Sequence, residues 1–210
     1  MSEMLDKLGQ LKLIPVVVIE NAADAAPLGR ALIEGGLPCA EVTFRTAAAP
    51  EAIAALSKLD GLLLGAGTVL TVDQARQAVD CGAKFIVTPG FNPDVVGYCV
   101  ENDIPITPGV CTPTQIEAAL GFGLNAVKFF PAEAFGGLKT LKAISAPYPM
   151  MKFIPTGGIN AANIGDYLAF EKVLACGGSW IVKKDLIAAN KFGEITELTR
   201  YAMNAIASIG

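Results

Sequence analysis

IPVVVIE (residues 14–20) is an apolar, β-branched run of the kind that forms buried strands, and the helical pattern ADAAPLGRALIEGG follows it almost at once. The same alternation of strand-like and helix-like segments continues to the end of the chain. Further strand-like runs recur at intervals of roughly 20 to 25 residues, at 39–45, 62–68, 84–90, 104–110, 125–131, 151–159 and 172–180.

Eight strand–helix units without a composition break or linker predict parallel strands joined by crossover helices. We therefore expect an α/β fold, a (β/α)₈ TIM barrel, as a single domain over residues 1–210 with a short N-terminal helix. The alternative is an open doubly wound sheet. That fold would usually show a glycine-rich nucleotide turn after the first strand, where this chain instead has VVVIENAAD.

Composition excludes several classes of protein. The 210 residues are 52% hydrophobic and 17% charged, with a net charge of -4 and no cluster of Lys and Arg. A nucleic-acid surface needs a concentrated positive patch, so no nucleic-acid partner is expected. The longest apolar run, residues 13–19, is too short to span a membrane, and MSEMLDKLGQ does not resemble a signal peptide. We expect a cytoplasmic protein without a membrane partner.

The chain contains no histidine, which limits its chemistry. A Ser-His or Cys-His nucleophile pair is impossible, and acid–base work must fall to Glu, Asp, Lys, Tyr or Cys. The five cysteines are scattered without a CxxC motif, which indicates reduced thiols rather than a disulfide or zinc framework: Cys39, Cys81, Cys99, Cys111 and Cys176. We predict no metal site.

Two strand-like runs place charged side chains inside the predicted barrel. In CAEVTFR (39–45), alternate residues share a face, so Glu41, Thr43 and Arg45 point inward together. The same rule in NAVKFFP points Lys128 inward, toward Glu41. A buried lysine is costly unless it is paired or neutral. The pair is either a structural ion pair that fills the barrel or part of an active site.

Glycine pairs end the last two predicted strands. Gly157–Gly158 closes the seventh strand, and Gly177–Gly178 with Ser179 closes the eighth. TIM barrels commonly build a phosphate site from backbone amides at these two strand ends. The other interpretation is that glycine simply permits tight turns there. Two pairs on neighbouring strands favour a phosphate site.

Two longer stretches resemble a known family. GLPCAEVTFR (36–45) and GLNAVKFFPAEAFG (123–136) are similar to the signature regions of the 2-keto-3-deoxy-6-phosphogluconate (KDPG) aldolases, a family that includes the 4-hydroxy-2-oxoglutarate (KHG) aldolases. The strand ends GAGTVL, PTGGI and GGSW extend the resemblance over residues 13–182. It implies a class I aldolase without cofactor or metal, usually a homotrimer.

The resemblance also implies a reaction. It is the cleavage of KDPG, a keto acid, to pyruvate and D-glyceraldehyde 3-phosphate, with cleavage of KHG to pyruvate and glyoxylate as a further activity. The choice among KDPG, its galactonate epimer and KHG stays open. Phe135 departs from the family pattern, in which a small polar residue is common, and bears on substrate preference.

Roles for individual residues follow from the resemblance. Lys128 corresponds to the Schiff-base lysine and Glu41 to the proton-shuttling acid–base. The resemblance further implies that Arg45 and Thr68 bind pyruvate, that Pro89 and Phe130 form the pocket wall, and that Thr156 faces the substrate. It assigns Gly157, Gly158 and Ser179 to the phosphate, and we add Gly178 because it belongs to the second glycine pair.

The side-chain types at these positions also explain why a Schiff-base reaction is chemically feasible. Apolar surroundings favour the neutral, nucleophilic form of a lysine, and an arginine offers a fork that matches a substrate carboxylate. Two rival functions remain at this stage, a phosphosugar isomerase or epimerase barrel and a noncatalytic barrel that binds a phosphorylated ligand. Neither needs an inward lysine, so borohydride trapping of a Schiff base distinguishes them.

Overall fold

Short parallel strands form the centre of the computed structural model, which describes residues 2–208. Each of the eight strand-like runs contains a strand, and the run 104–110 contains two because Pro108, which lacks an N–H, interrupts it. The strands are β1 Leu13–Val17, β2 Cys39–Thr43, β3 Leu63–Gly67, β4 Phe85–Val87, β5 Ile106–Thr107, β6 Gly109–Val110, β7 Ala126–Phe129, β8 Lys152–Pro155 and β9 Cys176–Gly178.

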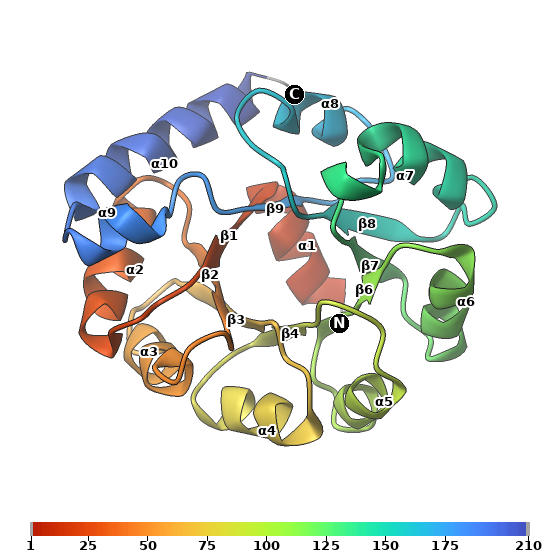
Figure 1. The fold of residues 1–210 in the computed structure, drawn as a ribbon, viewed down its shortest axis with the longest axis horizontal. Helices are drawn as coiled ribbons and strands as arrows, with labels where there is room; N and C mark the ends of the chain where they lie inside the picture. The colour runs from red at the N-terminus through yellow and green to blue at the C-terminus, as the bar shows by residue number, and fades with distance from the viewer. Residues whose placement is uncertain (1, 209–210) are drawn as a thin grey trace.

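All strand pairs are parallel, and the sheet curls strongly around a central axis (Figure 1). The hydrogen-bonded ladder has two parts, β5-β4-β3-β2-β1-β9 and β6-β7-β8. Between β8 and β9 the pairing is reduced to isolated bridges such as Thr156 with Gly177. The predicted α/β barrel architecture is thus confirmed, with one difference: the ladder is interrupted at Pro108 and thinned beside β9, so it does not close.

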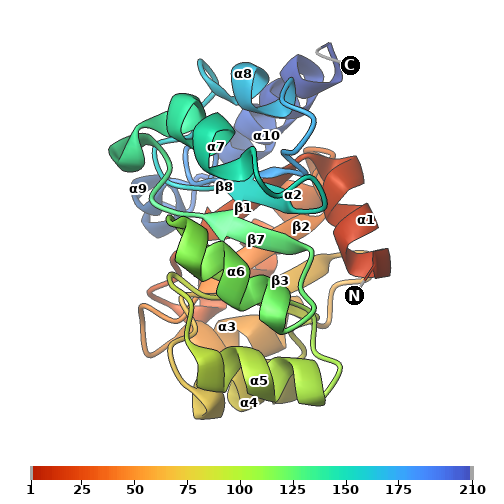
Figure 2. The same ribbon diagram turned by 90° about the vertical axis from the view of Figure 1, so that its right-hand side faces the viewer.

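Helices alternate with the strands and cover the outer face of the sheet (Figures 1 and 2). Several begin at residues suited to that position. Thr71 accepts a hydrogen bond from the N–H of Gln74, and Thr112 forms a capping box with Gln115. The helices are α1 Ser2–Leu11, α2 Ala25–Glu34, α3 Ala49–Leu56, α4 Val72–Asp80, α5 Pro93–Glu101, α6 Pro113–Gly121, α7 Gly137–Ser145, α8 Ile164–Leu168, α9 Lys184–Ala188 and α10 Phe192–Ala207, with 3₁₀ turns η1 Ala22–Asp24 and η2 Glu133–Phe135.

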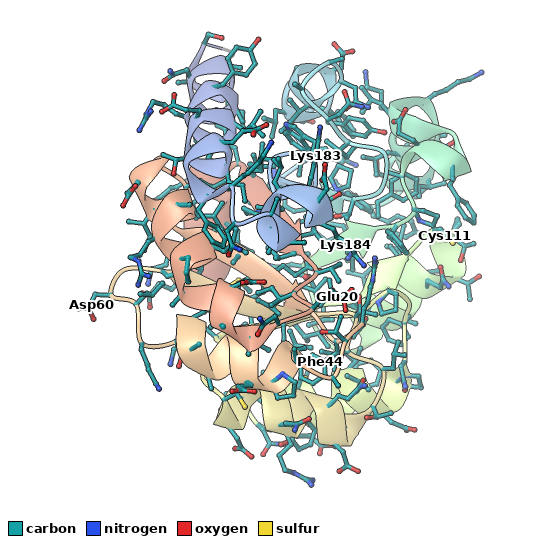
Figure 3. The ribbon with its side chains drawn as sticks, turned by 60° about the vertical axis from the view of Figure 1, so that its left-hand side comes forward. Glu20, Phe44, Asp60, Cys111, Lys183 and Lys184 are labelled. Carbon is teal, nitrogen blue, oxygen red and sulfur yellow. The ribbon has the colours of Figure 1, made fainter. Side chains whose placement is uncertain are left out.

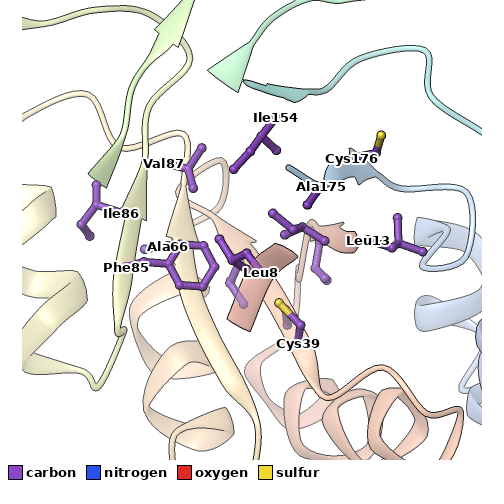
Figure 4. Packing of buried hydrophobic residues seen from close by; sticks show 14 of the residues in the cluster. Leu8, Leu13, Cys39, Ala66, Phe85, Ile86, Val87, Ile154, Ala175 and Cys176 are labelled. Carbon is purple, nitrogen blue, oxygen red and sulfur yellow. The ribbon is translucent and has the colours of Figure 1, made fainter. Parts of the chain in front are cut away.

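The expected N-terminal helix is present as α1, and it covers the amino ends of the strands. Its Met4 and Lys7 share one cavity wall with residues at or just before the starts of β3, β4 and β5, namely Leu63, Lys84 and Pro105. Leu8 is fully buried and belongs to the core together with Cys39 and Phe85 (Figure 4). Because α1 fills this end with apolar side chains, the carboxyl ends of the strands are left for a site.

No helix within residues 2–208 has the length and apolar character that crossing a membrane would require.

The packing of α1 gives a prediction about stability. Leu8→Ala removes a fully buried side chain and leaves a cavity at the barrel end, so it should lower the free energy of unfolding by about 2 to 5 kcal/mol. Met150→Ala is the control, because Met150 is 58% exposed and should change stability by less than about 0.5 kcal/mol. Urea unfolding followed by circular dichroism measures both. Equal effects of the two substitutions would show that α1 does not contribute to the core.

Candidate active site

The side chains of Lys128 and Glu41 meet inside the barrel, as the strand alternation predicts. Lys128 Nζ lies 3.4 Å from Glu41 Oε1, and the two residues are 5% and 2% exposed. They come from β7 and β2, 87 positions apart in the chain. Taking both groups out of water costs free energy that can exceed the gain from their attraction, so the pair is weak evidence of a stabilising role and is consistent with a chemical one.

Two glycines make room for this pair and its surroundings. A Cβ on Gly67, at the end of β3, would lie 2.1 Å from Glu41 Oε1, so only glycine leaves space for the carboxyl group. Gly109 pairs with Lys128 in the ladder, and a Cβ there would lie 2.2 Å from the carbonyl oxygen of Pro89. Pro89 therefore reaches the strand beside Lys128, where it can form a wall of the site.

A cavity of about 600 Å³ opens above the buried pair. Phe130 connects the two, because it lines the cavity and its ring centroid lies 5.0 Å from Lys128 Nζ. A cation close to an aromatic face is stabilised by the ring quadrupole. The wall of the cavity consists of Val16, Val18, Arg45, Phe130, Thr156, Gly157, Gly158, Ile159, Gly177, Gly178, Ser179, Trp180, Val182, Lys183 and Lys184.

Arg45 follows β2 and projects into the cavity wall. Its Nε donates to Thr68 Oγ1 at 3.4 Å, and Thr68 has the positive φ of 55° that few residues with side chains adopt. Within residues 2–208, Arg45 forms no ion pair with an acidic side chain. The guanidinium is thus available to an anionic group that enters the cavity.

The turn Gly157–Gly158 directs its carbonyl groups away from the cavity. The oxygen of Gly157 accepts from the N–H of Glu133 at 3.0 Å, and the oxygen of Gly158 accepts from the side-chain amides of Asn160 and Asn163, each at 3.1 Å. Neither glycine N–H has an acceptor among the residues that the structure describes. Free N–H groups on a cavity wall are suited to binding an anion.

Backbone conformation and close packing also require glycine at these positions. Gly157 and Gly158 have φ values of 99° and 83°, and a Cβ on Gly158 would lie 2.5 Å from Glu133 Cγ. Gly178 faces the Trp180 ring, which a Cβ would approach to 1.9 Å. The two interpretations of the glycine pairs, tight packing and anion binding, are therefore compatible.

Eleven residues were predicted for the site, and seven of them line the cavity: Arg45, Phe130, Thr156, Gly157, Gly158, Gly178 and Ser179. The other four lie outside the lining. Lys128 and Glu41 are buried below it, Thr68 reaches it through Arg45, and Pro89 lies beside the strand of Lys128.

Sequence reasoning missed a charged rim. Lys183 and Lys184 line the cavity, and Lys184 Nζ lies 3.1 Å from Glu20 Oε1, a residue 164 positions earlier (Figure 3). Their location just after the GGSW strand end was the available signal. It was weak, because isolated surface lysines are common in any chain.

Within residues 2–208, no three or more His, Cys, Asp and Glu side chains are grouped as metal ligands would be.

Comparison with known proteins supports a family assignment. A family model described as KDPG and KHG aldolase matches residues 4–198. The 2-dehydro-3-deoxy-phosphogluconate aldolase of Treponema pallidum is 50% identical, over 98% of this chain and 99% of its own length. The KHG/KDPG aldolase of Escherichia coli K12 is 41% identical, over 90% of each chain.

A solved structure agrees with these relatives. The KDPG aldolase from Legionella pneumophila, captured with pyruvate at low pH as a covalent carbinolamine intermediate, is 40% identical to this chain. The TM-score is 0.91, and the match covers 94% of this chain and 97% of the other. Since a family model covers nearly the whole sequence and relatives at this identity span it, this chain belongs to the KDPG and KHG aldolase family.

Proposed function

We propose that this protein is a class I aldolase that cleaves KDPG to pyruvate and D-glyceraldehyde 3-phosphate. The observation that carries the proposal is the buried amine of Lys128, 3.4 Å from Glu41, below a cavity with free N–H groups on its wall. The relatives named KDPG aldolase support it, and so does the related structure captured with a carbinolamine.

The first stage of the proposed reaction joins substrate and enzyme. Transfer of a proton from Lys128 to Glu41 would free the amine, which adds to the C2 carbonyl carbon, and a proton then shifts from the nitrogen to the oxygen to give a carbinolamine. Loss of water, with a proton from Glu41, leaves an iminium ion. At 3.4 Å, Glu41 is near enough to the amine to exchange protons during these steps with little movement.

The second stage breaks the carbon–carbon bond. Glu41, ionised after the loss of water, would take the proton of the C4 hydroxyl and could later return it to C3, and glyceraldehyde 3-phosphate leaves as the C3–C4 electron pair moves into the iminium, which becomes an enamine. Protonation of C3 restores an iminium of pyruvate, and water then releases pyruvate and regenerates the amine. Because the iminium accepts the electron pair, the proposed mechanism uses neither a metal nor a cofactor.

The cavity wall fits the two anionic ends of this substrate. Arg45, held by Thr68, would bind the carboxylate next to C2, while the N–H groups of Gly157 and Gly158 with Ser179 would bind the phosphate. Gly178, Thr156 and Phe130 would form the remaining walls of the cavity, and Pro89 would contribute from beside the strand of Lys128.

Cleavage of KHG to pyruvate and glyoxylate is a second proposed activity. It uses the same amine and carboxylate, and the E. coli relative is named a KHG/KDPG aldolase. Phe135, which departs from the family pattern as noted above, is 47% exposed in the segment after β7. Steady-state comparison of KDPG, its galactonate epimer and KHG ranks the three substrates.

The rival functions are less well supported. An isomerase or a noncatalytic phosphate-binding barrel would use the Gly157–Gly158 turn but has no need of an amine buried beside a carboxylate.

We also propose a homotrimer, in keeping with the family resemblance and with exposed apolar side chains such as Leu70, which is 51% exposed. Analytical ultracentrifugation measures that assembly directly.

The role of Lys128 can be tested by two substitutions. Lys128→Ala should reduce turnover of KDPG by about 10⁴-fold or more and abolish labelling by pyruvate and borohydride, because no amine remains. Lys128→Arg should be equally inactive while it keeps a charge beside Glu41. Circular dichroism checks that both variants fold. Substantial turnover in folded Lys128→Ala would overturn the Schiff-base mechanism.

Glu41→Gln tests proton transfer separately from binding. The amide keeps the size of the carboxyl group but cannot exchange its proton, so kcat for KDPG and for KHG should fall by about 10² to 10⁴-fold, with KM changed by less than about 3-fold. Glu101→Gln, on an exposed glutamate at the end of α5, is the control. A loss confined to one substrate would contradict the shared role of Glu41.

Ser179→Asp tests the phosphate site. A carboxylate on the cavity wall would repel the phosphate dianion, so kcat/KM for KDPG should fall by about 30-fold or more while kcat/KM for KHG stays within about 3-fold. Ser179→Ala, which removes only a hydroxyl, should lower kcat/KM for KDPG by less than about 10-fold. Equal losses for both substrates in Ser179→Asp would place the phosphate elsewhere.

A further inference from the structure

One buried tyrosine next to the cavity has no part in the mechanism described above. Tyr167, on α8, is 2% exposed, and its hydroxyl donates a short hydrogen bond to Glu133 Oε1. Burial raises the pKa of Tyr167, and the bond to Glu133 raises that pKa further, so the hydroxyl keeps its proton and stays a donor. The bond joins η2, which follows β7, to the helix that follows β8.

Two glycines leave the space that this pair occupies. A Cβ on Gly137 would lie 2.8 Å from Glu133 Oε1 and 3.1 Å from Tyr167 Oη. A Cβ on Gly158 would lie 2.5 Å from Glu133 Cγ. The Glu133 side chain, although exposed to solvent, therefore lies between the start of α7 and the Gly157–Gly158 turn and packs on Gly158.

The main chain of the same segment also holds the turn. The N–H of Glu133 donates to the oxygen of Gly157 at 3.0 Å, and the N–H of Ala132 donates to the oxygen of Thr156 at 2.8 Å. These bonds keep the Gly157 carbonyl outside the cavity. Because the N–H and C=O of a trans peptide unit point in opposite directions, the N–H groups of Gly157 and Gly158 point away from the bonded oxygens of Thr156 and Gly157, and both glycines line the cavity.

We propose that Glu133 and Tyr167 are positioning residues, which hold the N–H groups of Gly157 and Gly158 toward the cavity and thereby set the preference for phosphorylated substrates. This inference rests on the proposed function, because it assigns the turn to the substrate phosphate. Neither side chain lines the cavity. Both act through the turn, so the reacting carbons and Lys128 are unaffected when either is changed.

The test separates substrate recognition from catalysis. Tyr167→Phe removes only the hydroxyl that fixes Glu133, and Glu133→Ala also removes the packing on Gly158. Each variant should raise KM for KDPG by about 5-fold to 10-fold, in keeping with the loss of a hydrogen bond to a charged group, and change kcat by less than about 2-fold. For KHG, which carries no phosphate, kcat/KM should stay within about 2-fold of wild type.

The chain offers a matched control. Tyr148, just after α7, donates to Glu117 Oε1 at 2.9 Å, so Tyr148→Phe breaks a bond of the same type that does not involve the turn. It should leave the kinetics for KDPG and KHG within about 2-fold of wild type. Glu133→Gln should also stay within about 2-fold, since its amide oxygen can accept from Tyr167 and its carbons still pack on Gly158.

The outcomes separate this inference from the proposed function. Increased KM for KDPG alone in Tyr167→Phe and Glu133→Ala, with Glu133→Gln and Tyr148→Phe unaffected, supports the positioning role. Unchanged KM in both variants, or equal losses for KDPG and KHG, overturns it even though the wild type cleaves KDPG. If the wild type cleaves neither substrate, the proposed function fails and this inference fails with it. If the wild type cleaves KDPG but Ser179→Asp affects both substrates alike, the phosphate binds elsewhere, and this inference fails while the proposed reaction stands.

Discussion

The need to accommodate an amine and a carboxyl group inside an apolar sheet organises this molecule. Lys128 and Glu41 face each other across the barrel, and neither can lose its partner without leaving a buried group uncompensated. The neighbouring position 67 is a glycine, and its missing side chain leaves the space that the Glu41 carboxyl group fills. A buried polar pair contributes little to the stability of a core because both groups must be desolvated. The same arrangement brings the proposed nucleophile and the proposed acid–base within reach of each other.

The two ends of the strands serve different purposes. At the amino ends, α1 adds apolar side chains such as Leu8 to the core and carries no candidate chemistry. At the carboxyl ends, glycines both admit close packing and expose N–H groups, as at Gly157 and Gly158, whose carbonyls are bonded on the outer side. This division is the usual one for α/β barrels, in which stability and function occupy opposite faces.

Residues that do not line the cavity also shape the site, because they restrain residues that do. Thr68 restrains Arg45, and Glu133 restrains the glycine turn through its main-chain bond to Gly157 and the packing of its side chain on Gly158. Loops after β7 and β8 are thereby joined into one rigid wall. In the proposed mechanism, a cavity built in this way would bind both ends of the substrate and hold its reacting carbons near Lys128.

The eight strand positions, the inward direction of Lys128 and Glu41 and the glycine-rich strand ends can all be predicted from the amino-acid order, because period-two alternation and the turn requirements of glycine are local properties. The sequence also carried enough of two signature regions for the family to be identified. The pairing of Lys184 with Glu20 and the bond from Tyr167 to Glu133 are visible only in the folded chain. Those features join residues far apart in the chain, so they depend on how the loops and helices pack around the sheet and not on any local pattern.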